Sequence, residues 1–480
     1  MKTNTLDFDA QALREKILDL AMRGKLVPQD PNDEPASVLL EKIKVEKEQL
    51  IKEKKIKKSK PLAPITDEEK PFDIPDSWEW VRLGDVNTYN SESVHPDRTP
   101  DKTFELYSVP IFPTRKPEII KGEEIRSNKQ AVETGDVLLC KINPRINRVW
   151  KVSNFTDNEN IASTEWIVVR QREITTEYLR YSLMAPYFRN LLQSNVSGVG
   201  GSLTRAKPRE VRNYVLPIPP LSEQSRIAAK IAQLFALLRK VESSTQQYAK
   251  LQTLLKSKVL DLAMRGKLVE QDPHDEPASV LLEKIKAEKE QLVKEGKIKK
   301  SKPLPPIADD EKPFDIPDSW EWVRLGDIIE LVSGRDIAKK YHLSHKIHNA
   351  TPYITGASNI DDKGNITINE WIDNPSVVVT KGTLLLSVKG TIGKIAILQL
   401  PKAHIARQIM GIENIYNFNQ DFQKYFLESY IGELKKKAKS MIPGISRDDI
   451  ILAPFPFSPL IEQNKITNKI KKLFSLEIGE

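Results

Sequence analysis

The sequence predicts an α+β protein with two α/β insert domains in a pseudo-twofold inverted arrangement, separated by a long antiparallel coiled coil. The first observation is a repeat: the stretch 18–85 returns as 260–327 with the same length and only eight substitutions. The second is that about 130 residues after each copy differ between the halves. The third is a heptad pattern between the copies, typical of a helix packed along another helix. A repeated frame that carries two different inserts suits a protein that uses one geometry for two binding specificities.

The central helix is predicted from Ser222 to Met264, and at 1.5 Å per residue it would extend about 65 Å. Nine of its eleven seam positions are apolar or Tyr. The seam consists of Ile227, Ile231, Leu234, Leu238, Val241, Thr245, Tyr248, Gln252, Leu255, Val259 and Leu262. A helix that lies on a globular core is the alternative, but few core helices are this long.

The mate of this helix is predicted from the two ends of the chain. The segment 13–22 aligns with 255–264, and 460–474 aligns with 221–235. Laid end to end, the terminal helices therefore imitate one copy of the central helix. If the composite packs against the central helix in the opposite direction, the two inserts lie at opposite ends. The C-terminal helix is expected to end soon after Phe474, which leaves a short gap in the composite.

The repeat also predicts the domain boundaries. They are 1–22 for the N-terminal half-helix, 23–72 for the first helical arm, 73–216 for the first insert domain, 217–264 for the central helix, 265–314 for the second arm, 315–456 for the second insert domain and 457–480 for the C-terminal half-helix. In each arm, PASVLLEKIK predicts a helix that begins after a proline. The Lys-rich stretch that follows is either a solvated face or a contact with DNA phosphates or a partner protein.

Composition narrows the class of protein. The chain has 74 Lys and Arg against 66 Asp and Glu, with a net charge of +8 and a pI near 9.1, which suits a polyanionic partner. The single cysteine, Cys140, excludes an internal disulfide and is expected to be a small buried residue. No window reaches the roughly 18 apolar residues of a membrane span, so we expect a cytoplasmic protein.

The first insert contains basic segments with the composition of a phosphate-binding surface. GDVLLCKINPRINRVWKV predicts strand, loop and strand, with no acidic residue from Cys140 to Val152. SGVGGSLTRAKPREV combines a glycine-rich turn with hydroxyl and guanidinium donors, although a flexible surface loop is the alternative. The nucleic-acid-binding candidates here are Lys141, Arg145, Arg148, Lys151, Gly200, Ser202, Thr204, Arg205, Lys207 and Arg209.

The second insert repeats this logic with different residues. KGTLLLSVKGTIGKIAIL predicts two strands joined around Gly390 and Gly393, and KSMIPGISRDD takes the place of the glycine-rich loop. The candidates are Lys389, Lys394, Arg407, Gln408 and Arg447, the last corresponding loosely to Arg209. Trp78, Trp80, Trp320 and Trp322 open the inserts within identical text, so we expect core anchors rather than base-stacking residues.

Catalytic motifs are missing from the sequence. GTIGK lacks the spacing of a phosphate-binding P-loop, and there is no GxSxG elbow or Asn- or Asp-led Pro-Pro motif of an amino-methyltransferase. His342, His345 and His348 step by three, but no cysteine lies nearby to complete a zinc site. We therefore expect no catalytic, cofactor-binding or metal-binding residues in this chain.

These features together resemble the specificity subunits of type I restriction-modification systems. The resemblance rests on the duplicated LAMRGKLVPQDPNDEPASVLLEKIK arm, on IPDSWEWVRLGD at Ile74 and Ile316, and on LPIPPLSEQSRIAAKIAQLF at Leu216. It covers essentially the whole chain. The second helix entry departs from the pattern, because FPFSPLIEQ at Phe455 has one proline in place of the pair.

The resemblance implies a non-catalytic subunit in which two target-recognition domains each read half of a bipartite sequence in double-stranded DNA, and the coiled coil sets the spacer. It also implies two methyltransferase subunits that use S-adenosylmethionine, and restriction subunits that act as translocase and nuclease; no cofactor is expected in this chain. One alternative is a coiled-coil interaction scaffold, which predicts weak, salt-insensitive DNA association. A nuclease or methyltransferase in its own right is disfavoured by the missing motifs.

Overall fold

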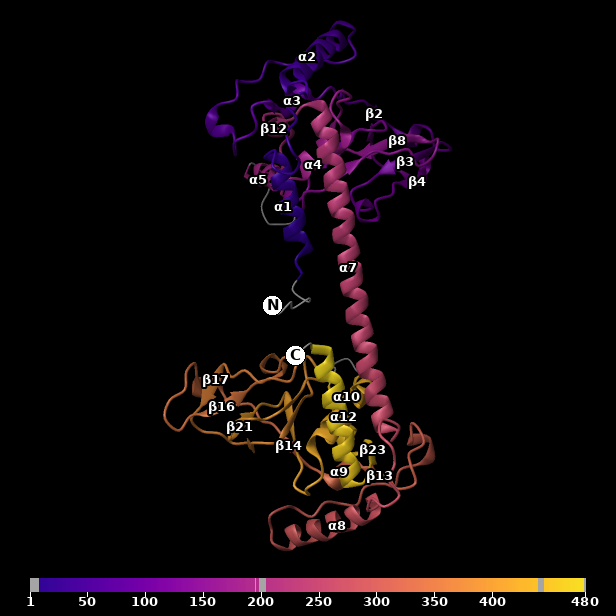
Figure 1. The fold of residues 1–480 in the computed structure, drawn as a ribbon, viewed down its shortest axis with the longest axis vertical. Coiled ribbons are helices and arrows are strands. Elements are labelled where there is room, and N and C mark those ends of the chain that lie inside the picture. Colours follow the sequence, from indigo (N-terminus) through magenta and orange to yellow (C-terminus); the bar gives the residue numbers. More distant parts are fainter. Residues whose placement is uncertain (1–7, 195, 198–203, 439–443, 479–480) are drawn as a thin grey trace. The chain divides into compact units, whose positions relative to one another are not determined.

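A computed structural model describes residues 8–194, 196–197, 204–438 and 444–478 (Figure 1). The chain forms two compact units, Met1–Gln246 and Gln247–Glu480. Each unit contains, in order, a helix, an arm, an insert and a second helix. Within the described residues, none of the helices combines the length and apolar character that a bilayer span requires.

The central helix predicted from the heptad pattern is confirmed as α7 (Leu221–Met264), which is continuous from the first unit into the second. In the first unit it runs antiparallel to α1 (Ala10–Met22). Arg14 Nη1 lies 3.0 Å from Glu242 Oε1, whereas Gln29, beyond the other end of α1, donates to Glu223 at 2.5 Å. Residue numbers thus rise along one helix as they fall along the other.

The second unit repeats this antiparallel pairing with α12 (Leu460–Ile478). Lys256 Nζ of α7 lies 5.6 Å from the ring centroid of Phe474, and Gln271 donates to Glu462. Both units therefore contain the helix pairing that the terminal repeats predict. How the two inserts are arranged relative to each other stays a prediction.

The predicted seam is buried only in part. Ile227 and Ile231 are buried in the core of the first unit, and Val259 in that of the second. By contrast Val241, Tyr248 and Leu255 are 44%, 48% and 51% exposed. Among the described residues the middle of the seam is therefore largely exposed, although Arg14 of α1 still reaches Glu242 there.

The arms form the predicted helices, α2 (Ala36–Lys52) and α8 (Ala278–Lys294), each entered through a proline. A one-turn 3-10 helix follows in each arm, η1 (Asp67–Glu69) and η6 (Asp309–Glu311). Arg82, only 4% exposed, donates to Glu69 of η1 and to the carbonyl oxygens of Ala63, Pro64 and Asn213. The buried guanidinium thus fastens the extended end of the arm to the insert.

Of the four tryptophans that open the inserts, Trp78 and Trp320 are core anchors as predicted, whereas Trp80 and Trp322 are only half-buried. Trp78 and Trp320 are each 3% exposed. Their indole N–H groups donate to Glu223 at 2.9 Å and to Glu462 at 2.8 Å. Burial raises the pKa of both carboxyl groups, although these hydrogen bonds oppose the shift. A buried polar pair therefore joins each insert to its following helix.

The first insert is built on a five-stranded sheet and a three-stranded sheet, and it also contains short helices. A five-stranded sheet has the order β2 (Ser93–Val94), β5 (Lys129–Ala131), β8 (Glu159–Ser163), β3 (Thr103–Tyr107), β4 (Glu118–Lys121), with β3 and β8 parallel. A three-stranded sheet has the order β7 (Val149–Lys151), β6 (Val137–Cys140), β9 (Trp166–Val169). The helices are α3 (Leu83–Val86), α4 (Thr176–Met184), α5 (Pro186–Ser194) and α6 (Pro208–Val211), and β10 (Val196–Ser197) pairs with β11 (Arg205–Ala206).

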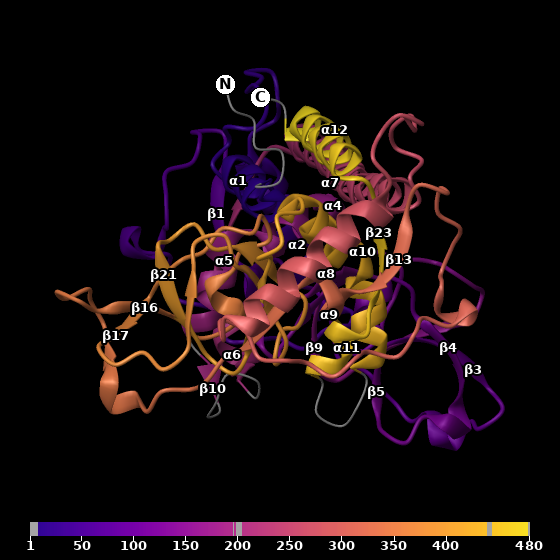
Figure 2. The same ribbon diagram turned by 90° about the horizontal axis from the view of Figure 1, so that it is seen from below.

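The second insert has a five-stranded sheet of order β15 (His342–Leu343), β17 (Glu370–Ile372), β16 (Thr351–Ile354), β21 (Lys402–Ile405), β18 (Val378–Thr380), of which Figure 2 shows β16, β17 and β21. A four-stranded sheet has the order β14 (Glu330–Ser333), β22 (Ile409–Glu413), β19 (Leu384–Ser387), β20 (Ile395–Ile397). The helices are α9 (Leu325–Ile328), α10 (Gln420–Lys437) and α11 (Arg447–Ile451).

The larger sheets of the two inserts share the arrangement of four of their five strands, although the sequences of the inserts differ. In each larger sheet a central parallel pair, β3 with β8 or β16 with β21, has one antiparallel strand on either side. The strand of the larger sheet that comes first in sequence joins opposite edges in the two inserts: β2 pairs with β5, whereas β15 pairs with β17. The ends of the inserts are also alike, since β1 (Glu79–Arg82) pairs with β12 (Val215–Ile218) and β13 (Glu321–Arg324) with β23 (Pro454–Phe457).

Candidate nucleic-acid interface

The predicted strand, loop and strand of the first insert are β6, the loop 141–148 and β7. Two asparagines of this loop, Asn143 and Asn147, adopt left-handed backbone angles with φ of 50° and 47°. Asn tolerates this region better than most residues, because its short side chain hydrogen-bonds locally. The loop is therefore a turn of defined shape.

Three segments meet at this loop. Lys141 N donates to the carbonyl oxygen of Glu165 at 2.9 Å, and Ala206 N donates to that of Lys141 at 2.9 Å. Asn143 N donates to the Thr204 carbonyl at 2.8 Å. We call the segments 141–148, 163–166 and 204–206 the first junction. It brings together residues that are up to 65 positions apart in sequence.

The first junction gathers five of the predicted candidates: Lys141, Arg145, Arg148, Thr204 and Arg205. Arg145 is exposed and its Nε donates to Asn143 Oδ1 at 3.0 Å, while Arg148 Nη1 donates to the Ile142 carbonyl at 3.2 Å. Arg205 is exposed, and its Nε and Nη2 each lie 3.4 Å from a carboxylate oxygen of Glu165. Sequence reasoning missed Glu165, because a distant strand pairing brings it beside these cations.

The other candidates of the first insert lie outside the junction. Lys151 is on β7, and its Nζ is 2.5 Å from Glu177 of α4. Lys207 precedes α6 and Arg209 lies on it, and both are exposed. Gly200 and Ser202 fall outside the described residues. The predicted role of all these residues in binding stays a prediction.

An equivalent second junction is built in the second insert from 388–390, 406–409 and 444–445. Val388 N donates to the Gln408 carbonyl at 2.8 Å, and Ile445 N donates to the Val388 carbonyl at 2.9 Å. Lys389, which is exposed, forms an isolated bridge with Gly444. Gln408 packs over Gly356, where an added Cβ would lie 2.4 Å from its Oε1. The two strands predicted here, β19 and β20, are confirmed.

The remaining candidates of the second insert have partners of their own. Lys394 forms an ion pair with Asp362. Arg407 lies within the second junction, with its side chain 69% exposed and its Nε 2.6 Å from Asp336. Arg447 Nη1 donates to the Leu331 carbonyl at 2.7 Å, which ties α11 to β14. Lys389, Arg407 and Gln408 are therefore the candidates that the structure brings together.

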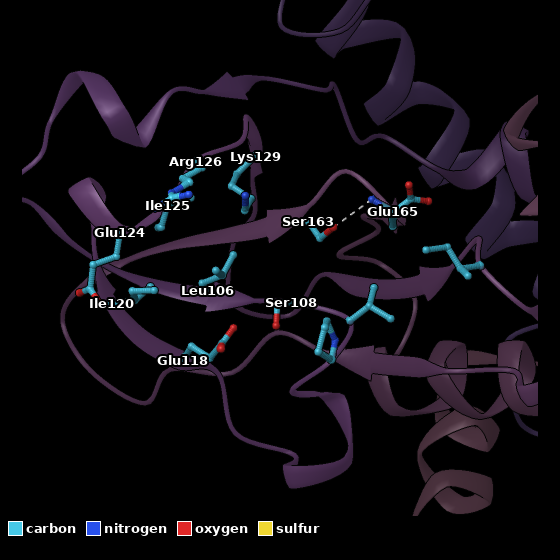
Figure 3. Close-up of a pocket in the computed structure, with 13 residues that line it drawn as sticks. Leu106, Ser108, Glu118, Ile120, Glu124, Ile125, Arg126, Lys129, Ser163 and Glu165 are labelled. Carbon is cyan, nitrogen blue, oxygen red and sulfur yellow. Dashed lines mark hydrogen bonds between the residues drawn. The ribbon is translucent and has the colours of Figure 1, made fainter. Parts of the chain in front are cut away.

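A pocket of about 440 Å³ adjoins the first junction (Figure 3). Glu165 lies at one end of it and Glu124 at the other, with Arg126 and Lys129 between them. Burial lowers the pKa of Lys129, whose Nζ donates to Ser127. The pocket thus offers both donors and acceptors.

The cysteine and the histidine that could carry chemistry have structural contacts instead. Cys140 is buried, as predicted, and burial raises the pKa of its thiol, which disfavours the nucleophilic thiolate. Among the described residues, no group of three or more His, Cys, Asp or Glu is arranged to hold a metal ion. His342, from the predicted histidine cluster, contacts Glu370 at 2.9 Å and the Ile337 carbonyl at 3.0 Å.

Comparison with known proteins assigns these units to a family. The type I restriction modification DNA specificity domain matches residues 75–252 and 317–479, which together are well over half of the chain. The chain belongs to the family of type I restriction-modification specificity subunits. Each match covers nearly all of one insert and runs into the helix that follows it, whereas both arms of this specificity subunit lie outside the matched residues.

Individual relatives agree with the family. The EcoAI specificity subunit of Escherichia coli is 34% identical over 97% of this chain and 89% of its own length. The EcoEI specificity subunit of Escherichia coli is 38% identical, over 67% of this chain and 62% of its own length. A chain from a solved type I restriction-modification system aligns with a TM-score of 0.61 and 23% identity, covering 85% of this chain and 92% of that one, which supports the fold.

Proposed function

We propose that this specificity subunit recognises a bipartite sequence in double-stranded DNA, with one insert for each half-site. The observation that carries the proposal is the pair of junctions: one backbone arrangement is built twice, with different side chains in each. Equal geometry with unequal hydrogen-bonding groups is what two readers of different sequences require. The exposed Lys and Arg around both junctions would neutralise phosphates and displace counterions.

The proposal extends to the assembly in which the subunit acts. The duplicated arms and helices would bind two methyltransferase subunits, one for each copy, and restriction subunits would join for cleavage in the cytoplasm. S-adenosylmethionine would bind the methyltransferase subunits, so that this chain contributes recognition and no catalysis. α7 would set the spacer between the half-sites.

Exchange of one insert tests the proposal. Residues 86–215 would be replaced by the matching insert of the EcoAI specificity subunit, and the complex with its methyltransferase subunits would be used for methylation mapping. We expect one half of the methylated sequence to change and the other to persist. A change in both halves, or in neither, would contradict independent reading.

Salt dependence separates this function from an interaction scaffold. Binding of the complex to DNA that contains the mapped target should weaken steeply between 50 and 200 mM salt, because phosphate contacts release counterions. A weak association that salt leaves unchanged would favour the scaffold.

The role of α7 has its own test. Insertion of one heptad after Val241 adds about 10 Å of helix, which is equivalent to roughly three base pairs of DNA. We expect the spacer in the methylated sequence to lengthen accordingly. An unchanged spacer would exclude a ruler function for α7 while leaving base recognition by the inserts intact.

A further inference from the structure

Strand pairing places Glu165 and Gln408 at equivalent positions of the two junctions. In the first insert, Cys140 at the end of β6 pairs with Trp166 at the start of β9, and the residue after Cys140 donates to the carbonyl of Glu165. Glu165 thus directly precedes the paired strand.

The same description holds for the second insert. Ser387 ends β19 and pairs with Ile409 at the start of β22, and Val388 N donates to the carbonyl of Gln408. Gln408 is therefore the structural counterpart of Glu165, although the two inserts differ in sequence.

A second pair of positions follows from the isolated bridges. Ile142 bridges to Arg205 in the first junction, and Lys389 bridges to Gly444 in the second. Where the first junction has the carboxylate of Glu165 and the guanidinium of Arg205, the second has the amide of Gln408 and Gly444. The second junction has a cation, Lys389, on its hairpin loop instead. The backbone is shared, but the donors and acceptors are exchanged.

The turn that presents Glu165 is held firmly. Glu165 N donates to Ser163 Oγ at 3.2 Å (Figure 3). The buried Gln130 donates from Nε2 to the carbonyls of Ser163 and Trp166, each at 2.9 Å. The Glu165 side chain, 31% exposed, thus projects from a backbone fixed on both sides. A preorganised acceptor of this kind loses little entropy on binding.

We propose that Glu165 and Gln408 determine which base each insert reads, an inference that rests on the proposed function. A carboxylate only accepts hydrogen bonds, so it matches the N4 amino group that cytosine presents in the major groove. Adenine also offers an amino group, but its N7 acceptor lies beside it and repels a carboxylate. The amide of Gln408 both donates and accepts, so it matches N6 and N7 of adenine.

Arg205 extends this assignment to the neighbouring base. Its 3.4 Å contacts with Glu165 are long for charged hydrogen bonds, so neither group is saturated in the free protein. A guanidinium matches O6 and N7 of guanine in a bidentate manner. The half-site of the first insert therefore contains a cytosine read by Glu165 and a guanine read by Arg205 within one base step, whereas that of the second contains an adenine read by Gln408.

Single substitutions test the assignment in the complex with the methyltransferase subunits. Glu165→Gln should move the preference at one position of one half-site from cytosine to adenine, with methylation of the original sequence falling about 5- to 150-fold relative to the new one. Gln408→Glu should produce the opposite change in the other half-site. Each effect would be measured by methylation mapping and by competition binding with single-base variants of the target.

The charge-matched control is Glu159→Gln. Glu159 lies on the same strand as Ser163, at its opposite end, and pairs with Lys102 at 2.5 Å. This substitution removes the same charge but should leave the sequence preference unchanged.

The outcomes separate base reading from mere positioning of Arg205. A changed base at one position supports the inference. Uniformly weaker binding to all targets by Glu165→Gln, or an undiminished preference for the original sequence, overturns it. Both of these results leave the proposed function standing, because that depends on the exchange of whole inserts.

Discussion

Arg324 at the start of the second insert makes the same hydrogen bonds as Arg82 at the start of the first, with carbonyls of Pro305, Pro306 and Leu452 and the carboxylate of Glu311 as acceptors. At the junctions the opposite holds: the backbone hydrogen bonds recur while the side chains do not. The repeated stretches therefore keep their shape through side-chain contacts that tolerate few substitutions. The inserts keep theirs through backbone pairing, which leaves their side chains available to differ.

Loss of the buried guanidinium should have the largest effect on stability. Arg82→Ala removes the partner of Glu69 and leaves three carbonyls of the first unit without this donor. We expect the free energy of unfolding of that unit to fall by about 3 kcal/mol, measured by urea denaturation, because several hydrogen bonds from a charged donor are lost. Arg324→Ala should cost the second unit a similar amount, and a loss in only one unit would contradict the equivalence of the arms.

Glycine substitutions sharpen the comparison within the arms. Gly24 has φ of +66°, and an added Cβ would lie 2.4 Å from Pro75 Cγ, so Gly24→Ala combines backbone strain with an overlap worth about 1 to 3 kcal/mol. Gly296 has φ of +71° with nothing within 4 Å, and its copy in the first arm is Lys54. Gly296→Ala should therefore lower the melting temperature much less than Gly24→Ala. Equal effects would show that backbone strain alone, and not the overlap with Pro75, causes the loss of stability.

The buried carboxylates come next. Glu223→Ala leaves the Trp78 indole N–H and the Gln29 amide without their acceptor, at a cost of about 1 to 3 kcal/mol. Glu462→Ala should remove the shared acceptor of Trp320 and Gln271 and lower stability by a similar amount. Thermal unfolding followed by tryptophan fluorescence would report both changes, and a neutral result for either would mean that another acceptor takes over.

The smallest effect concerns pH. The Arg82 guanidinium lowers the pKa of Glu69 to about 2, so this carboxylate stabilises the folded chain above its ordinary pKa near 4.5. The contribution is lost as the pH falls from 4.5 toward 2. The difference in urea midpoint between the natural chain and Glu69→Gln should therefore shrink over that range. Glu68→Gln, at an exposed neighbour, is the control and should show no such change.

The sequence predicted the elements that depend on local pattern. The long helix α7 follows from its heptads, α2 and α8 from their proline entry, and the β6–β7 and β19–β20 hairpins from basic loops between apolar runs. The heptads predict the helix itself, but at Val241 and Tyr248 they do not predict burial, since both side chains are exposed. Glu165 escaped notice since its position beside Arg205 depends on pairing across 40 residues.

The ladders that close each insert have a consequence for how such proteins change. Glu79 of β1 faces Ile218 of β12, and Glu321 of β13 faces Phe457 of β23, so each insert enters and leaves its unit on neighbouring strands. Main-chain hydrogen bonds hold each strand pair together, and the strand that leaves the insert reads VLPI in one copy and PFPF in the other. An entire insert can thus be exchanged by joining the chain at two neighbouring points. A new DNA-sequence preference can then arise in one step, without changes to the arms and helices.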